Sequence, residues 1–451
     1  MNNRPEEYSF GALLSVLRDS IRARARSASP RKARVLENFF SLSALQVARY
    51  VFPLIALPYL LRVVGFANYG LIAFAQALVA YLVTLTDYGF NFTATRDIAQ
   101  HRGDPRSVSK IFFSVMFAKA LLVLVSLGVL VAIVLAVPRF SRDWPLYLFA
   151  FGSVPGNALF PVWFFQGIEE MKYIAVLGFV DRLLFTLLLF VFIRHSSQYL
   201  YVPLVNSVGV IIAGAVGAVI AIRRIGVGII IPRLEEVWGQ FRKGWHVFVS
   251  NAAITGYGST RIFAVGLFAA PAITGAYALA ERLTGVAYSF GMVPLQQAIY
   301  PRLAELYVRS RTKAFQVMAA LQRLVTMVWT VLALVAFWVA PFVVRLMAGT
   351  DSPTAVLAFR LLLVGVVLGN ANILRLQFLL VAGLDKTYSR IVLGESLVGI
   401  LLSFGGACAW SYLGPAASVI AVQAVGIILA VGVVWRNAVA VGARAAEDAG
   451  A

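Results

Sequence analysis

An acid and a base stand side by side in an otherwise apolar stretch, YALAERLTGVAYSF at 277–290. Consecutive residues lie roughly 100° apart around a helix, so Glu281 and Arg282 cannot simply face and neutralise each other. In apolar surroundings a carboxylate must find a cation or an ion, and an arginine must find an anion. Arg282 is therefore predicted to face an anionic ligand, and Glu281 to pair with a cation from the other half of the chain or to bind a coupling ion.

Further charged residues fall within apolar stretches. The cations are Arg49, Lys119, Arg182, Arg261, Arg282, Arg323, Arg360 and Arg375, and the acids are Asp87, Asp181, Glu281 and Glu395. Each charge inside a membrane costs about 3 kcal/mol on insertion scales, so most must face protein or a water-filled cavity. Because the cations outnumber the acids, pairing leaves positive charge over, and this surplus favours an anionic ligand.

Four cations lie deepest in their stretches and are predicted to bind substrate: Arg49, Arg261, Arg282 and Arg323. Pro53 has no N–H, so it leaves the carbonyl of Arg49 without its helical donor. A cation and a free carbonyl at one level are typical of a cavity wall.

The remaining charges have simpler interpretations. Lys119 is close enough to a membrane surface to extend its ammonium into it. Asp181 and Arg182 are expected to form structural pairs with neighbouring helices. Gln76 and Asp87 are eleven residues apart and are predicted to share one helix face.

Composition shows that these charges belong to a membrane protein. The chain has 451 residues, of which 60% are hydrophobic and 13% charged, and its mean hydropathy is +0.83. Apolar runs long enough to cross about 30 Å of hydrocarbon recur throughout. We therefore predict an all-α polytopic protein with about twelve transmembrane helices. The predicted spans are 38–61, 68–90, 111–137, 145–167, 173–193, 200–222, 246–268, 272–300, 314–340, 354–380, 388–410 and 415–435.

Lys and Arg concentrate in alternate loops. The other loops hold only Arg62, Arg139, Arg142, Arg194 and Arg345. Positive loops stay in the cytoplasm, so both termini are predicted to be cytoplasmic. The net charge of +19 is thus a topology signal, and a nucleic-acid partner is not expected.

The longest basic loop, 223–245, divides the chain into an N-terminal six-helix bundle, 38–222, and a C-terminal one, 246–435. Residues 1–37 are basic and are expected to form an amphipathic helix on the inner leaflet, or else a disordered tail. Residues 436–451 form a cytoplasmic tail.

A faint repeat supports this division. GLIAFAQAL at 70–78 and GAYALAERL at 275–283 share Gly, two Ala and Leu at matching places, and each opens the second span of its half. Duplicated transporter halves show such repeats.

Other function classes lack their residues. Cys408 is the only cysteine, His101, His195 and His246 are scattered, and no set of His, Cys and carboxylates has metal-site spacing. No GxxxxGK[ST] phosphate loop is present, so no built-in ATPase is expected. Short outer loops also argue against a membrane-bound glycan ligase or polymerase. We expect no enzyme, no cofactor and no metal.

Several motifs resemble a known family. PLIALPYLLRVVGFANYGLIAFAQALVAYL, followed by DYGFNFTATRDIA, is similar to the start of Wzx-type polysaccharide and O-antigen flippases. FPVWFFQGIEEMKY at 160–173 resembles the fourth span of that family. Within it, Trp163, Phe164 and Phe165 are expected to form an interfacial aromatic belt, with stacking on sugars as the alternative.

The resemblance implies the fold of the multidrug/oligosaccharidyl-lipid/polysaccharide exporter superfamily: two six-helix bundles around a central cavity. It also implies a function, the transfer of an undecaprenyl-pyrophosphate-linked oligosaccharide, such as an O-antigen, capsule or exopolysaccharide repeat unit, from the inner to the outer leaflet of the bacterial cytoplasmic membrane by alternating access. A polysaccharide polymerase is a further expected partner. The resemblance also implies that acids couple transport to an ion gradient, and it carries this role to Asp87 of the DYGF motif. With Glu281 and Glu395 as further candidates from the sequence itself, H⁺ or Na⁺ is expected to act at Asp87, Glu281 or Glu395.

Two related functions stay open. A cation-coupled multidrug antiporter would have an acidic or neutral cavity, whereas the surplus here is cationic. A peptidoglycan-precursor flippase fits a cationic cavity, but the first-span and DYGF motifs favour the polysaccharide flippases.

Overall fold

The computed structural model describes the backbone of residues 30–449 and the side chains of 51–288, 296 and 299–433. The described backbone contains helices, turns and loops but no strand, so the protein is all-α. The N-terminal helix expected before residue 30 and the side chain of Arg49 lie outside the described residues.

The first bundle contains nine α-helices and two short helices of other types. They are α2 (Pro30–Asp87), α3 (Phe90–Gln100), α4 (Pro105–Ala136), α5 (Pro138–Ser141), α6 (Trp144–Phe151), α7 (Ser153–Leu159), α8 (Val162–Gly167), α9 (Met171–Phe192), η1 (Ser196–Leu200), α10 (Tyr201–Val219) and η2 (Ile220–Arg224). Helix α2 contains the first predicted span and most of the second. Gly65 lies between the two spans and breaks the helix there, with φ 76° and ψ 169°. Only glycine adopts such a conformation readily.

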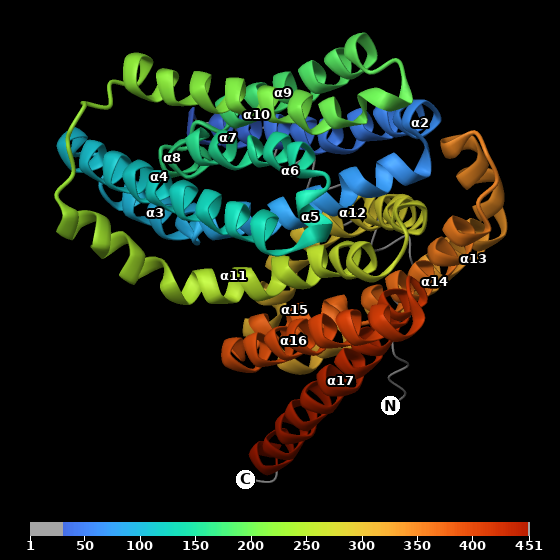
Figure 1. Ribbon diagram of the computed structural model, residues 1–451. Helices are drawn as coiled ribbons and strands as arrows, with labels where there is room; N and C mark the ends of the chain where they lie inside the picture. The colour runs from blue at the N-terminus through green and yellow to red at the C-terminus, as the bar shows by residue number, and fades with distance from the viewer. Residues whose placement is uncertain (1–29, 450–451) are drawn as a thin grey trace.

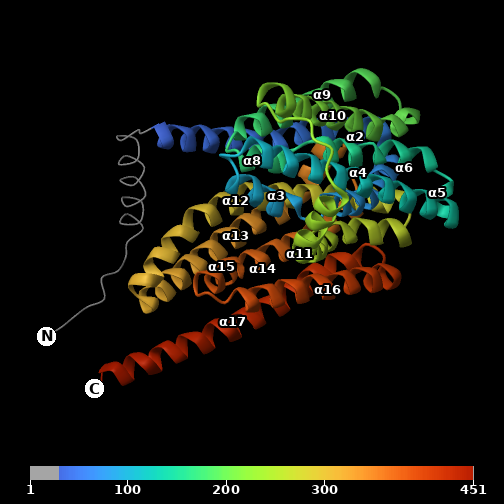
Figure 2. The same cartoon turned by 90° about the vertical axis from the view of Figure 1, so that its left-hand side faces the viewer.

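The second bundle contains seven helices. They are α11 (Leu234–Phe268), α12 (Pro271–Arg309), α13 (Arg311–Ala348), α14 (Pro353–Asn370), α15 (Ile373–Val381), α16 (Asp385–Trp410) and α17 (Leu413–Ala449). In Figure 1 the blue-to-green helices α2–α10 fill the upper part, the red helices α16 and α17 lie in the lower part with α11 between, and the orange α13 lies along the right side. The quarter-turn in Figure 2 shows the same order.

Each predicted span falls on one helix or on consecutive helices, and the span 145–167 is divided among α6, α7 and α8. The described residues hold nine helices that are long and apolar enough to cross a membrane, and one of these, 51–100, includes the end of the first span and the whole second. The spans predicted at 246–268 and 272–300 lie in α11 and α12, which are not among the nine. The predicted class, a polytopic helical membrane protein of two bundles, is confirmed.

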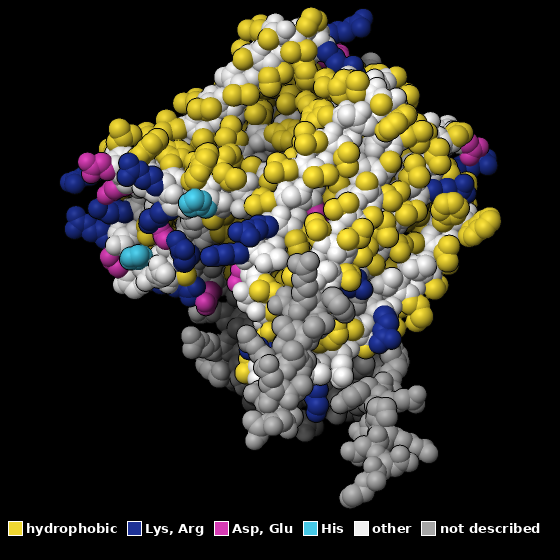
Figure 3. All heavy atoms as spheres, turned by 90° about the horizontal axis from the view of Figure 1, so that it is seen from below, with side chains coloured by type: hydrophobic (Ala, Val, Ile, Leu, Met, Phe, Trp, Pro, Cys, Tyr) yellow, Lys and Arg dark blue, Asp and Glu magenta, His cyan; other side chains and the backbone are white. Residues whose placement is uncertain are grey.

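The outer surface suits a bilayer. Large apolar side chains are exposed along several helices, among them Leu124, Leu135, Trp338 and Leu401. Figure 3 shows hydrophobic side chains over most of the visible face and a gathering of Lys, Arg, Asp and Glu side chains at one end. A soluble monomer rarely exposes such large apolar patches, so this surface is made to face lipid.

Arg139 of the first bundle binds the C-terminal end of α11 in the second bundle. Arg139 donates to the carbonyls of Leu267 at 2.9 Å and Ala269 at 3.1 Å, and also to that of Gly266. These carbonyls belong to the last turn of α11, where the helix leaves acceptors unpaired and carries partial negative charge. The contact therefore links the two bundles at this end of the molecule.

The three aromatic residues of α8 correct one expectation. Trp163, Phe164 and Phe165 are all fully buried, whereas an interfacial belt would leave them at the surface. They pack in the core of the first bundle, where the rings of Phe112 and Trp163 lie 5.6 Å apart. Because α8 is short and follows Pro161, it folds inward instead of continuing along the surface.

Candidate functional site

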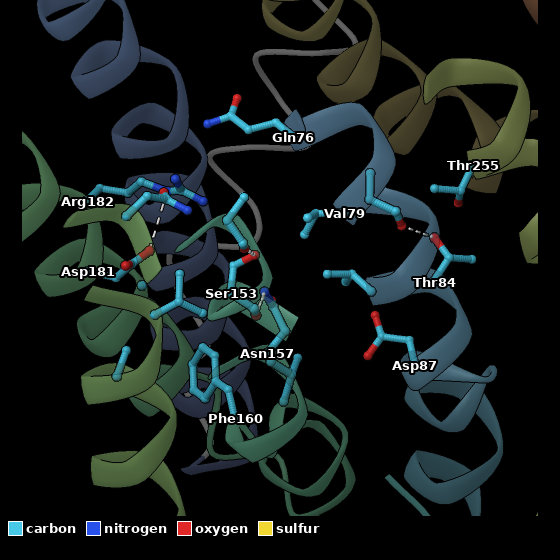
Figure 4. A pocket seen from close by; sticks show the side chains of 18 of the residues that line it. Gln76, Val79, Thr84, Asp87, Ser153, Asn157, Phe160, Asp181, Arg182 and Thr255 are labelled. Atoms are coloured by element: carbon cyan, nitrogen blue, oxygen red, sulfur yellow. Dashed lines mark hydrogen bonds and ion pairs between the residues drawn. The ribbon is translucent and has the colours of Figure 1, made fainter. Parts of the chain in front are cut away.

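A cavity of about 740 Å³ opens inside the first bundle and reaches the second. Faces of α2, α7, α9 and α10 form its walls, α11 contributes Asn251 and Thr255, and α12 contributes Arg282. Its polar lining consists of Gln76, Thr84, Asp87, Asn91, Ser153, Asn157, Asp181, Arg182, Asn206, Asn251, Thr255 and Arg282. Figure 4 shows Asp181 and Arg182 on one wall and Thr84 and Asp87 on the wall opposite.

Helical spacing explains this lining. On α2 the cavity is lined by Gln76, Ala80, Val83 and Asp87, which recur at intervals of three and four. Such residues form one face of a helix. The prediction that Gln76 and Asp87 share a face is confirmed.

A smaller cavity of about 390 Å³ lies between α2, α11 and α12. Both cavities are lined by Pro53, Gln76, Ala80 and Arg282, so these residues lie at the boundary between the cavities, which we call the neck. Glu281 lines the smaller cavity only. The acid and base that stand side by side in the sequence thus have different surroundings.

Arg282, one of the predicted substrate residues, lines both cavities. Its side chain is exposed in the neck of the two cavities. No carboxylate forms an ion pair with it among the side chains that the structure describes. A guanidinium is charged at any relevant pH and offers five donors, so this residue can bind an anion that enters the neck.

Glu281 accepts a hydrogen bond from Nε of Arg261, and the Tyr277 hydroxyl lies 3.3 Å from the same oxygen. The guanidinium of Arg261 also lies 5.1 Å from the ring centre of Tyr257. Arg261 therefore neutralises Glu281 and does not line either cavity. The predicted pairing of Glu281 with a cation from the other half of the chain is wrong, because Arg261 and Glu281 belong to adjacent helices of one bundle.

Asp87 is also paired. Lys119 Nζ lies 2.9 Å from Asp87 Oδ1, and the side chain of Lys119 is only 1% exposed. The expectation that Lys119 reaches a membrane surface is therefore wrong, since its ammonium turns inward to the carboxylate. A buried ammonium needs such a partner because burial without one is strongly unfavourable.

Asp181 and Arg182 lie on the cavity wall, with Arg182 Nε 3.6 Å from Asp181 Oδ2. Both residues were predicted to form structural pairs with neighbouring helices, and Arg182 was not among the predicted substrate residues. Helical spacing could have indicated that Arg182 lines the cavity, because Gly178 and Phe185 lie one turn away on either side and line it too.

Two further predicted residues lie elsewhere. Arg323 is exposed on α13, donates to the carbonyl of Ala319 at 3.4 Å and lines neither cavity. Glu395 lies on α16, where a side chain added at Gly426 would collide with its Oε1. That oxygen is buried and has no hydrogen-bond partner among the described residues.

The surroundings of Glu395 are polar. Asn370 and Asn372, which are 0% and 1% exposed, lie where α14 ends and α15 begins. Neither amide group has a hydrogen-bond partner in the part of the chain that the structure describes. Nδ2 of Asn372 also lies close to Gly426, and therefore near Glu395. Buried polar groups without a partner call for a bound water or ion.

The described residues contain no group of three or more His, Cys, Asp or Glu side chains that could hold a metal ion.

The chain is similar to known proteins over most of its length. The family described as "Polysaccharide biosynthesis protein" matches residues 35–307. A protein of Escherichia coli (strain K12) named "Putative O-antigen transporter" is 26% identical over 393 residues, which cover 87% of this chain and 94% of that protein. A protein of Shigella dysenteriae with the same name is 26% identical over 270 residues, 60% of this chain and 67% of that one.

Two solved structures share the fold. One is the inward-facing conformation of a multidrug resistance MATE family transporter of the MOP superfamily, with a TM-score of 0.65, 14% identity, and coverage of 87% of this chain and 97% of that one. The other is the lipid II flippase MurJ in an inward closed conformation, with a TM-score of 0.68, 11% identity, and coverage of 88% and 87%.

Proposed function

The chain belongs to the polysaccharide biosynthesis protein family, and from this membership we propose that it is a flippase for an undecaprenyl-pyrophosphate-linked oligosaccharide. It moves an O-antigen, capsule or exopolysaccharide repeat unit from the inner to the outer leaflet of the bacterial cytoplasmic membrane. The names of its relatives in Escherichia coli and Shigella dysenteriae support the glycan substrate.

The observation that carries this proposal is the position of Arg282. It stands at the neck, where the cavity of the first bundle and the smaller cavity adjoin, without an ion pair to any described carboxylate. Asp87 is neutralised by Lys119, and Glu281 by Arg261. The neck therefore has a positive charge that is free to bind the pyrophosphate, and each charge-assisted hydrogen bond there contributes about 1.5–3 kcal/mol.

The position of the cavities supports transport by alternating access. Their walls come from both bundles, so rocking of one bundle against the other changes the side to which they open. The sugar and pyrophosphate occupy the cavities while the polyprenyl tail stays in lipid. With both termini cytoplasmic, the basic end faces the inner leaflet, where the lipid-linked glycan is made.

Glu395 is the best-placed residue for coupling to H⁺ or Na⁺. Asp87 and Glu281 each have a cationic partner, whereas Oε1 of Glu395 is buried without a hydrogen bond to any described residue. Asn370 and Asn372 add unpaired amide oxygens at the break between α14 and α15. Carboxylate and amide oxygens suit a small cation, and a lone carboxylate suits a proton.

A depletion experiment in the host tests the proposed function. The protein is depleted, undecaprenyl-pyrophosphate-linked glycan is quantified in each leaflet, and equal amounts of wild type, Arg282→Ala or Arg323→Ala are supplied. Arg323→Ala is the matched control, since Arg323 is exposed away from both cavities. We expect glycan to accumulate in the inner leaflet on depletion, and wild type and Arg323→Ala to clear it while Arg282→Ala does not.

Other results point to the alternatives. Clearance by Arg282→Ala would keep the flippase but remove the proposed anion site. Accumulation of a peptidoglycan precursor instead would identify that lipid as the cargo. If no lipid-linked glycan accumulates in a host without a second copy of the gene, the substrate is wrong, and drug efflux becomes the activity to measure.

A further inference from the structure

We propose that the large cavity divides recognition of the substrate: Arg282 holds the diphosphate at the neck, and carboxamides deeper in the first bundle recognise the sugar. Asn206 on α10 and Asn157 on α7 are then specificity-determining residues for the glycan. This inference rests on the proposed function and names the part of the cavity that selects the cargo.

Helical spacing places both carboxamides on the cavity wall. Asn206 stands on the α10 face that also includes Pro203, Val210 and Ala213, and Asn157 lies between Ser153 and Phe160 on α7. Both asparagines are partly buried. Figure 4 shows Asn157 between the wall of Asp181 and Arg182 and the wall of Asp87. Polar groups thus come from separate helices onto one enclosed space.

The hydrogen-bonding capacity of the two amides is largely unused within the protein. Asn157 Nδ2 donates to the carbonyl of Ser153 at 2.8 Å, which leaves its Oδ1 as an acceptor. Asn206 makes no side-chain hydrogen bond to any residue that the structure describes. A carboxamide offers two donors and one acceptor without charge. Sugar hydroxyl and acetamido groups, which both donate and accept, match this set.

Charge argues against a diphosphate at this wall. Asp181 and Asp87 both line the large cavity, and each carboxylate has a cation beside it, so these pairs add no net positive charge to hold an anion there. The unpaired guanidinium of Arg282 lies instead at the neck, beside the smaller cavity. A ligand that is anionic at one end and neutral but polar at the other therefore fits in one orientation only.

Aromatic side chains in the same cavity suit the apolar C–H face of a sugar ring. Phe160, directly after α7, and Phe185 of α9 line the same cavity. Faces of aromatic rings pack against the C–H faces of sugars, while the hydroxyl groups at the ring edge reach polar side chains. A few placed polar groups in a largely apolar pocket are the usual basis of ligand specificity.

Binding of two lipids to the purified full-length protein tests the division. The probes are undecaprenyl diphosphate without sugar and the undecaprenyl-diphosphate-linked oligosaccharide extracted from the host, and the increase of Tm with ligand concentration gives each Kd. Wild type is expected to bind the glycan-bearing lipid at least about tenfold more tightly, because a site built for hydrogen bonds discriminates strongly against a ligand that lacks them.

Variants separate the two ends of the substrate. Asn206→Leu is expected to reduce the preference for the glycan-bearing lipid about tenfold and to leave the Kd for undecaprenyl diphosphate unchanged. Arg282→Gln weakens binding of both lipids. Asn157→Leu is a second, independent test in case Asn206→Leu does not fold. Asn68→Leu is the control, because Asn68 lies outside both cavities and bonds to the carbonyl of Ser196.

Each outcome is decisive. Unchanged preference in both asparagine variants would overturn the inference. If wild type binds the two lipids equally, the sugar site is wrong but a diphosphate-binding flippase survives. If wild type binds neither lipid, the proposed function itself fails.

Discussion

Gly70 of α2 and Gly275 of α12 touch each other where the two bundles cross. A Cβ built on Gly275 would lie 2.0 Å from the carbonyl oxygen of Phe66 and 3.0 Å from the amide nitrogen of Gly70. These glycines open the two matching stretches of the repeat. The matched residues Gln76 and Glu281 then line the smaller cavity together. Equivalent positions that meet in this way are expected beside a pseudo-two-fold axis between duplicated halves.

Gly275→Ala should therefore destabilise the protein. The added methyl group has backbone atoms of α2 in its place, so the helices must separate, and overpacking of this kind costs about 1–3 kcal/mol or more. Gly285→Ala is the matched control on the same helix, because nothing lies within 4 Å of a Cβ there. Thermal unfolding in detergent measures both. Equal unfolding temperatures for the two variants would contradict the close crossing.

The Asp87–Lys119 pair should be structural. Removing one partner of a buried pair costs about 3–5 kcal/mol, and less where a partner is as exposed as Asp87 at 34%. Asp87→Asn is expected to lower stability because it leaves the buried Lys119 uncompensated, and Asp87→Asn with Lys119→Met should restore most of the loss. Unfolding of the single and double variants measures the coupling. An additive double variant would show that the two groups do not interact.

Glu395→Gln should uncouple transport from the ion gradient. The amide keeps the shape of the side chain but removes the charge that binds a cation and the site that takes up a proton. In vesicles, the rate of the variant with a gradient should fall to the rate without one. Asp385→Asn is the control, since Asp385 is exposed at the start of the same helix. A gradient that still accelerates Glu395→Gln would assign coupling elsewhere.

Acid should weaken one link between the bundles. Glu236 of α11 accepts a hydrogen bond from Lys110 of α4 at 3.0 Å, and this bond lowers the pKa of Glu236 below its usual range. A lowered folded-state pKa gives stability that is present above the unfolded value, about 4.3, and is lost as pH falls through the folded value. The difference in Tm between wild type and Glu236→Gln should thus be constant above about pH 5 and should close below about pH 4. A difference that persists in acid would refute this assignment.

Much of the fold is predictable because a bilayer imposes simple rules. A membrane-spanning helix needs about 20 apolar residues, so spans appear directly as apolar runs. Even the break in α2 at Gly65 falls between the predicted spans 38–61 and 68–90. The inward fold of α8 was not predictable in this way, because the same aromatic residues suit an interface and a core.

The site was predictable only in part, because a sequence shows that a charge is inside the membrane but not which neighbour it meets. Arg282 and Arg261 have the same type and similar depth, yet one faces the cavities and the other pairs with Glu281. That difference depends on how α11 and α12 are rotated against each other. Asn157 and Asn206 carry no insertion cost large enough to single them out, and only the assembled walls bring them together.

Flipping by the reconstituted protein is the most direct test of glycan transfer through a site that contains Arg282. Vesicles contain undecaprenyl-pyrophosphate-linked glycan and the protein, and membrane-impermeant periodate reports how fast glycan becomes accessible on the opposite leaflet. We expect rapid transfer with wild type and with Arg323→Gln. Transfer with Arg282→Gln should be about ten- to a hundredfold slower, because the variant loses one charged hydrogen bond. Transfer by wild type at the rate of protein-free vesicles, or by Arg282→Gln at the wild-type rate, would contradict this expectation.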